Sequence, residues 1–353
     1  MSSNCPRTRF LVWILKYTQK PHLIFLFAAL TLTFATSARA ATLVVTKTAD
    51  TNDGVCDADC SLREAVGIAS SNGEDDTIVF DQAVFSTENT IILSTEIVFA
   101  RDPSPSGGYT VSVLGPGREL LALSGGGTSR IFSIQNHRAV YIEGLTFTNG
   151  FAVSGGAIHS TTSHVTIVSS TFISNTAEGL IPVLNGNFYG AEGGAIAAGR
   201  VTIANSSFQN NVVRGKFGLW QGTFYVGIGL GGALRTTASN SLIINCSFEN
   251  NVAQGADGPG DTPVRDGGEG SGGAIYGASI VISSEFVSNR AEGGDGVGGV
   301  GSVPQARPLR LPLSLSHPQR RPAGLGRDRE PDHARHPGRR GARDQGAAGA
   351  GGG

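Results

Sequence analysis

The feature that most constrains this chain is an internal repeat. The tetrapeptide Gly-Gly-Ala-Ile/Leu begins at positions 155, 193, 231 and 272, and the pattern Phe-x-x-Asn follows each copy 14 to 17 residues later. Self-similarity at a period of about 40 residues is typical of folds that stack one structural unit on the next. The aligned residues of the second pattern are Phe172, Phe208, Phe248 and Phe286, with Asn175, Asn211, Asn251 and Asn289.

A short run rich in β-branched residues separates the two patterns in every copy: 165–168, 201–204, 241–244 and 279–282. Such runs favour strands, and no Asn-Gly or Asp-Gly turn joins consecutive runs into hairpins. We therefore predict an all-β fold, a single-stranded parallel β-helix over residues 101–302. With rungs of about 20 residues, each repeat would supply two coils. The alternative, a β-propeller, needs more strands per repeat.

The repeated residues then have definite places in this fold. Phe and Ile would point inward and stack along the axis, and Asn would hold tight corners. Gly-Gly would sit where the backbone bends to positive φ. The 51 glycines disfavour a helical bundle. Residues 41–302 carry twelve Lys and Arg against twenty-four Asp and Glu, which excludes nucleic acid as the main partner.

A β-helix must protect its core at its ends, and residues 41–100 are suited to form an N-terminal cap. Residues 42–46 and 77–80 are strand-like, and between them Ser61 and Glu64 form a capping box before one short apolar-faced helix at 62–69. We expect this helix to lie across the first coil.

The two ends differ from the rest. Residues 1–40 combine basic residues, an apolar stretch at 23–36 and a small-residue cleavage site, so they predict a signal peptide; an uncleaved anchor is the alternative. Residues 303–353 are rich in Arg, Pro and Gly, with ten Arg and no aromatic residue, and this composition predicts a disordered tail. We interpret this tail as the product of an out-of-frame reading, against the alternative of a genuine basic extension.

Cysteines and acidic residues are candidates for a disulfide or a metal site. Cys56 and Cys60 are close in an exported chain, which predicts a disulfide, with zinc as the rival. Cys246 replaces the Ser of the other repeats and is expected to be a small buried thiol. The acidic loop at 50–59 invites a weak Ca²⁺ hypothesis, but its spacing does not fit an EF-hand. We predict no metal or organic cofactor.

The sequence gives no catalytic residues. His137, His159 and His164 lack an acidic neighbour at matching phase in a second repeat. The variable segments between repeats carry aromatic residues that suit contacts with sugars or proteins, and we select Tyr189, Trp220 and Tyr225 as possible loop contacts.

Two motifs carry a resemblance. The paired GGAI and FxxN elements resemble the repeats of chlamydial polymorphic outer membrane proteins and related bacterial surface β-helix proteins. Residues 60–65 spell Cys-Ser-Leu-Arg-Glu-Ala, the hallmark of the CSLREA domain of secreted bacterial β-helix proteins. The resemblance implies a right-handed β-helix exposed on, or released from, a bacterial cell, and it does not imply catalysis. A C-terminal barrel or anchor commonly follows in such proteins, and nothing here matches one.

We therefore expect a secreted or outer-membrane, cell-surface scaffold that is monomeric and structural or adhesive. Its partners would be surface glycans or proteins of a host or neighbouring cell, with no nucleic acid, and it would meet a membrane only through a missing C-terminal anchor. The alternative is a β-helix carbohydrate-active enzyme, a polysaccharide lyase or glycoside hydrolase, which would show carboxylates aligned on neighbouring rungs.

Overall fold

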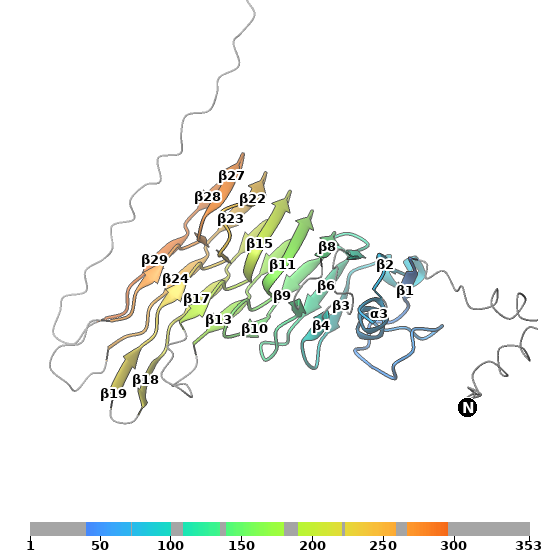
Figure 1. Ribbon diagram of the computed structural model, residues 1–353, viewed down its shortest axis with the longest axis horizontal. Coiled ribbons are helices and arrows are strands. Elements are labelled where there is room, and N and C mark those ends of the chain that lie inside the picture. Colours follow the sequence, from blue (N-terminus) through green and yellow to red (C-terminus); the bar gives the residue numbers. More distant parts are fainter. Residues whose placement is uncertain are drawn as a thin grey trace, which may run out of the picture. The chain divides into compact units, whose positions relative to one another are not determined.

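The computed structural model describes residues 40–71, 73–99, 109–134, 139–179, 190–220, 223–258 and 267–295. The predicted signal peptide, the predicted tail and Tyr189 lie outside these residues, as does His137. The described chain is a parallel β-solenoid, in which each coil contributes strands to several parallel sheets (Figure 1).

Sheet 1 is the largest, with twelve strands in the described chain. Its strands β11 and β15 are long enough to span two of the short runs that stay separate in other coils. Its members are β1 (Thr42–Val45), β2 (Asp76–Phe80), β4 (Ile97–Phe99), β5 (Thr110–Leu114), β7 (Phe132–Ile134), β8 (Ala139–Glu143), β11 (Ile158–Val168), β15 (Ile196–Ala204), β21 (Leu234–Thr236), β22 (Ser241–Ile244), β26 (Ile275–Tyr276) and β27 (Ser279–Ile282).

Three smaller parallel sheets complete the coils, and a coil contributes at most one strand to each of them. Sheet 2 contains β3 (Asn89–Ile92), β6 (Leu121–Ser124), β9 (Thr146–Thr148), β12 (Thr171–Ile173), β16 (Ser207–Gln209), β23 (Ser247–Glu249) and β28 (Glu285–Val287). Sheet 3 contains β10 (Phe151–Ala152), β13 (Thr176–Glu178), β17 (Val212–Arg214), β24 (Val252–Gln254) and β29 (Arg290–Glu292). Sheet 4 contains β14 (Ala191–Glu192), β20 (Gly229–Leu230) and β25 (Gly270–Ser271).

Each repeat supplies one coil, so the prediction of two coils per repeat is wrong. Phe172 pairs in parallel register with Phe208, and Phe208 pairs with Phe248. Residues that hydrogen-bond across these coils are 36 and 40 apart in sequence, whereas an earlier pair, Gly150 and Asn175, is only 25 apart. The later coils are longer because their sequences carry more residues between sheet 3 and the next Gly-Gly pair.

The Gly-Gly pair is required by the backbone at the start of each coil. In the second copy, Gly193 has a φ of +58°, where a side chain is disfavoured. A Cβ on Gly194 would lie 2.1 Å from the carbonyl oxygen of Gly232 in the next coil. The two glycines therefore permit both the bend and the close stacking of coils.

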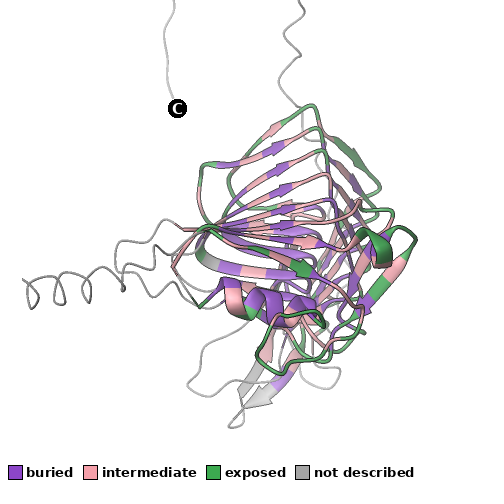
Figure 2. Cartoon of the chain, turned by 90° about the vertical axis from the view of Figure 1, so that its right-hand side faces the viewer, coloured by how far each residue is buried: buried purple, intermediate pink, exposed green. Residues whose placement is uncertain are grey.

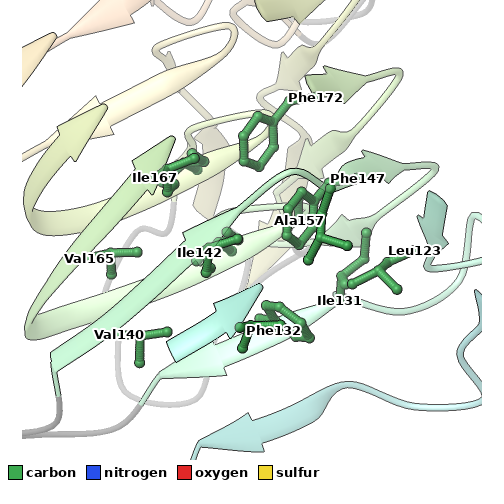
Figure 3. Packing of buried hydrophobic residues seen from close by; sticks show 14 of the residues in the cluster. Leu123, Ile131, Phe132, Val140, Ile142, Phe147, Ala157, Val165, Ile167 and Phe172 are labelled. Carbon is green, nitrogen blue, oxygen red and sulfur yellow. The ribbon is translucent and has the colours of Figure 1, made fainter. Parts of the chain in front are cut away.

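The main core is one cluster of apolar side chains that runs through the stacked coils, and a second, small cluster of buried residues comes from sheets 3 and 4 (Ala177, Ala191, Val213 and Ala253). Val140 and Val165 lie one above the other on neighbouring strands, as do Ile142 and Ile167 (Figure 3). Buried positions alternate with outward ones along these strands, which is the pattern of a sheet with one face in the core.

The N-terminal segment folds as the capping box predicts. Helix α3 (Leu62–Ala69) begins at Ser61, whose side chain accepts from the backbone N–H of Glu64 while Glu64 reaches back to the backbone of Ser61. The helix packs against β1, β2 and β4 and buries its apolar face in the common core. Figure 2 shows it as a largely buried helix beside exposed loops. A second short helix, α4 (Gln82–Phe85), follows β2, and β2, β3 and β4 already pair with coil strands.

One element was not expected from the sequence, an antiparallel hairpin. Strands β18 (Phe217–Trp220) and β19 (Thr223–Val226) pair with each other in the variable segment that follows β17. The two residues between the strands, Gln221 and Gly222, are not an Asn-Gly or Asp-Gly pair, so the hairpin was not predicted.

Candidate functional site

The Asn residues of the repeat form an internal ladder at the corner between sheets 2 and 3, here called the Asn corner (Asn175, Asn211, Asn251 and Asn289). The Nδ2 group of Asn211 donates to the Phe172 carbonyl at 3.0 Å and to Oδ1 of Asn251 at 2.9 Å. Its Oδ1 accepts from the backbone N–H and from Nδ2 of Asn175, at 3.1 and 3.0 Å. Asn211 is fully buried, and every hydrogen bond of its amide side chain crosses to another coil.

The residue before each ladder Asn makes the turn. Ser174, Asn210, Asn250 and Ser288 all have φ of +54°. Short polar residues tolerate this left-handed conformation better than most others. The corner thus combines one exposed residue that bends the chain with one buried residue that joins the coils.

The Phe residues stack directly beside this ladder. The ring centroids of Phe172 and Phe208 are 4.8 Å apart, and those of Phe208 and Phe248 are 4.7 Å apart, with nearly parallel rings. Phe286 stacks on Phe248 at 4.9 Å, but it is 40% exposed because it lies in the last described coil. Phe147 extends the column in the other direction, on Phe172.

The other repeated corner lies between sheets 1 and 2 and is here called the Ser corner (Ser170, Ser206, Cys246 and Ser284). The Ser206 hydroxyl accepts from the backbone N–H of Ser170 at 3.2 Å and donates to the Ala204 carbonyl of its own coil at 2.8 Å. Cys246 takes the same position as a free, buried thiol, and its Sγ donates to the Ile244 carbonyl at 3.2 Å. Burial raises the pKa of this thiol, which keeps it protonated.

Charged groups, in contrast, hold the N-terminal cap together. Burial opposes ionisation of Glu64, but hydrogen bonds from the backbone N–H groups of Ser61 and Asp53 outweigh it and lower the pKa of the Glu64 carboxyl. The pKa of Asp50 is likewise lowered: burial raises it, but Arg63, at 2.8 Å, and Ser94 favour the charged form. These carboxylates orient the loop against α3.

The same loop contains the predicted Cys56–Cys60 disulfide, with the Cα atoms 4.4 Å apart. Its other acids are engaged locally: Asp53 accepts from Val55 N–H, and Asp57 accepts from Asp59 N–H. Within the described part of the chain, no three His, Cys, Asp or Glu side chains gather as metal ligands. The local hydrogen bonds of Asp53 and Asp57 thus give these acids a structural role in the loop.

The structure places two of the three predicted contact residues on the hairpin. Trp220 ends β18 and Tyr225 lies in β19, where it pairs with Gly218. Tyr225 is partly exposed. Lys216, which precedes the hairpin, forms an ion pair with Glu178.

A small hollow on sheet 1 brings together residues that sequence reasoning did not connect. His159, Glu192 and Arg235 line a cavity of about 130 Å³. Arg235 Nη2 is 3.2 Å from Glu192 Oε1, and the buried Nε of Arg235 has no hydrogen-bond partner in the described chain. Burial, then Arg130, lowers the pKa of His159 despite the opposing effect of Glu96, so the imidazole is neutral at pH 7. The parallel register of β11, β15 and β21 places these residues on neighbouring coils. The sequence analysis did not predict one coil per repeat, so it could not bring them together.

The geometry defines the protein as a parallel β-solenoid with ladder-stabilised corners. In comparisons of the sequence, no family model matches the chain, and no curated protein matches it. In the described residues, no helix has both the length and the apolar character that crossing a membrane requires.

Proposed function

We propose that this protein is an exported scaffold of the right-handed parallel β-helix class, displayed on or released from a bacterial cell, that adheres to surface glycans or to proteins of neighbouring cells. Right-handedness is the rule for parallel strands joined by a crossover in one sheet. The resemblance to CSLREA-domain proteins and to the repeats of polymorphic outer membrane proteins supports the proposal, as does the Cys56–Cys60 disulfide, since such bonds persist in oxidising compartments.

The observation that carries the proposal is the Asn ladder. The polar side chain that recurs in each repeat makes its hydrogen bonds inside the fold, between coils. The buried ladder therefore builds a rigid rod-like support, and recognition is left to exposed residues, both those of the recurring turns and those that vary between coils. The hairpin β18–β19, with its aromatic residues, is such a variable feature.

Adhesion can be tested with Tyr225→Ala in the full chain. We expect labelled wild-type protein to bind cells or a glycan array, and we expect the variant to lose at least half of that binding. The matched control is Tyr276→Ala, which removes a 39% exposed tyrosine from β26. Equal binding by wild type and Tyr225→Ala would show that the hairpin does not contribute to adhesion. Absence of any binding by wild type would contradict adhesion itself.

One observation favours a second function, a carbohydrate-active enzyme. The hollow at His159 holds a neutral imidazole, a carboxylate and a guanidinium, which are groups used in acid–base chemistry. Glycoside hydrolysis generally uses two carboxylates, but Glu192 is the one carboxylate among the described residues that line this hollow, and it is paired with Arg235. The scaffold is for this reason the preferred function.

The enzyme hypothesis has its own test. If it holds, neutral and acidic polysaccharides incubated with the protein release reducing ends or unsaturated products, and His159→Gln abolishes this release. His164→Gln is the matched control, because His164 lies on the same strand but bonds to Thr202 outside the hollow. Release that is equal in wild type and His159→Gln would exclude the site.

A further inference from the structure

A polar groove runs along the outside of the Ser corner, and it is formed by the turn residues of successive coils. Two adjacent hollows of about 500 and 510 Å³ share Arg118 and Asn205 as lining residues, and together they are here called the corner groove. Five coils contribute turn residues to it: Gly144, Ser169, Asn205, Asn245 and Ser283, all with positive φ.

The length of the corner groove follows from the stacking. Parallel strands are about 4.8 Å apart, so four intervals between five coils span about 19 Å. A ligand that contacts Gly144 at one end and Ser283 at the other must therefore be extended and several units long. Compact metabolites would fill only part of this length.

The amide side chains in the groove are oriented by each other. Asn245 Nδ2 donates to Asn205 Oδ1 at 2.7 Å. This bond leaves the Nδ2 group of Asn205 as a donor and Oδ1 of Asn245 as an acceptor, and neither has another hydrogen-bond partner in the described chain. Both side chains are exposed, so a donor and an acceptor are presented side by side to solvent.

The other end of the groove is more apolar. Leu114 and Pro116 line it, next to Arg118, whose Nη1 donates to the Asn205 carbonyl at 3.2 Å. Glu143 also lines this end, and it accepts a hydrogen bond from the Tyr141 hydroxyl at 2.7 Å, which raises the pKa of Tyr141. An apolar floor beside fixed polar groups matches a ring with a C–H face and hydroxyl edges.

The charged side chains that line the corner groove favour a neutral ligand over an acidic one. Among the described residues that line the groove, Arg118 is the one basic residue, and three carboxylates line it too: Glu119, Glu143 and Glu285. Arg118 is also paired with Glu119 at 3.4 Å. An anionic polymer would be repelled by this excess of carboxylates, whereas carboxylates accept hydrogen bonds from sugar hydroxyls.

We infer that the corner groove binds a neutral, extended oligosaccharide along the stacked coils. The inference rests on the proposed adhesive function and assigns it a ligand class and a place. The sugar rings pack on Leu114 and Pro116, and their hydroxyls exchange hydrogen bonds with Asn205 and Asn245.

The test uses the full chain and calorimetric titration with cellohexaose, xylohexaose and mannohexaose as neutral probes and hexagalacturonate as the anionic one. The double variant Asn205→Asp/Asn245→Asp keeps residues that tolerate positive φ but removes the amide donor of Asn205 and adds charge. The matched control is Asn210→Asp/Asn250→Asp, which makes the same change at exposed turn residues of the same coils outside the groove.

We expect at least one neutral hexasaccharide to bind wild type more tightly than hexagalacturonate. We also expect the groove variant to lose at least tenfold in affinity while the control changes less than twofold. No binding of any neutral probe, preferred binding of the anionic probe, or an equal loss in both variants would overturn the inference. If adhesion persists in the groove variant but depends on Tyr225, the groove is refuted and the proposed function is not. If wild type binds no cell and no glycan, the proposed function is refuted as well.

Discussion

The cap and the repeat coils solve one problem in two different ways. Both must hold polar groups inside a protein where water is excluded. The cap uses charges and a covalent bond, with Glu64 and the Asp50–Arg63 pair beside the Cys56–Cys60 disulfide. The coils use neutral amides and hydroxyls that bond across the stack. A neutral ladder can be repeated without accumulating like charges, whereas a charged network suits a place that occurs once.

Asn211→Ala is the substitution that we expect to destabilise the coils most. It removes four hydrogen bonds between coils and leaves buried backbone groups of neighbouring coils unpaired. We expect a loss of at least about 3 kcal/mol in the free energy of unfolding. Denaturant unfolding measures it, with the exposed turn variant Asn210→Gly as control. A loss below about 1 kcal/mol would mean that the ladder is not a main support.

The corresponding destabilising substitution in the cap is Glu64→Gln. The change preserves shape but turns one carboxylate oxygen into a donor that faces a backbone N–H of Asp53 or Ser61. We expect a loss of about 2 kcal/mol, with faster amide exchange confined to residues 62–69. Glu88→Gln, at an exposed position, serves as control. Faster exchange throughout the coils would show that cap and coils are not separable.

A smaller effect is expected at the Ser corner. Ser206→Ala removes one hydrogen bond between coils, since the hydroxyl makes its other bond within its own coil. We expect a loss of about 1 kcal/mol in the same unfolding experiment. Cys246 already shows that this corner accepts another side chain. A cost equal to that of Asn211→Ala would remove the distinction between the two corners.

Acid should affect the cap and spare the coils. The folded-state pKa values of Glu64 and Asp50 are lowered, so their stabilisation is present above the unfolded values of about 4 and is lost as pH falls through the folded ones. Amide protection factors, corrected for intrinsic rates, should fall at residues 62–69 below about pH 4. Those of the Asn corner should not change, because neutral amides do not titrate in this range. Equal loss in both regions would contradict the comparison.

Much of the fold could be predicted because identical residues recur at one phase. Phe208 and Asn211 recur with their counterparts, and the capping box at Ser61 and Glu64 is a local signal. The coil length could not be predicted, because an inserted loop and a second rung both lengthen a repeat. The coil length sets which residues of neighbouring coils lie side by side, so the His159 hollow and the corner groove could not be predicted from the sequence. The hairpin β18–β19 was missed because its turn lacks the usual residues.

The most direct test of one coil per repeat is a cross-link between neighbouring rungs. Thr171 and Ser207 are register partners, and their hydroxyl oxygens are 3.0 Å apart. In a chain with Cys5 and Cys246 replaced by Ser, the pair Thr171→Cys/Ser207→Cys should form a disulfide, because adjacent rungs lie within its reach. Thr171→Cys/Ser247→Cys, two coils apart, should stay reduced. Mass spectrometry that finds the second link, or lacks the first, would contradict the stacking on which this account depends.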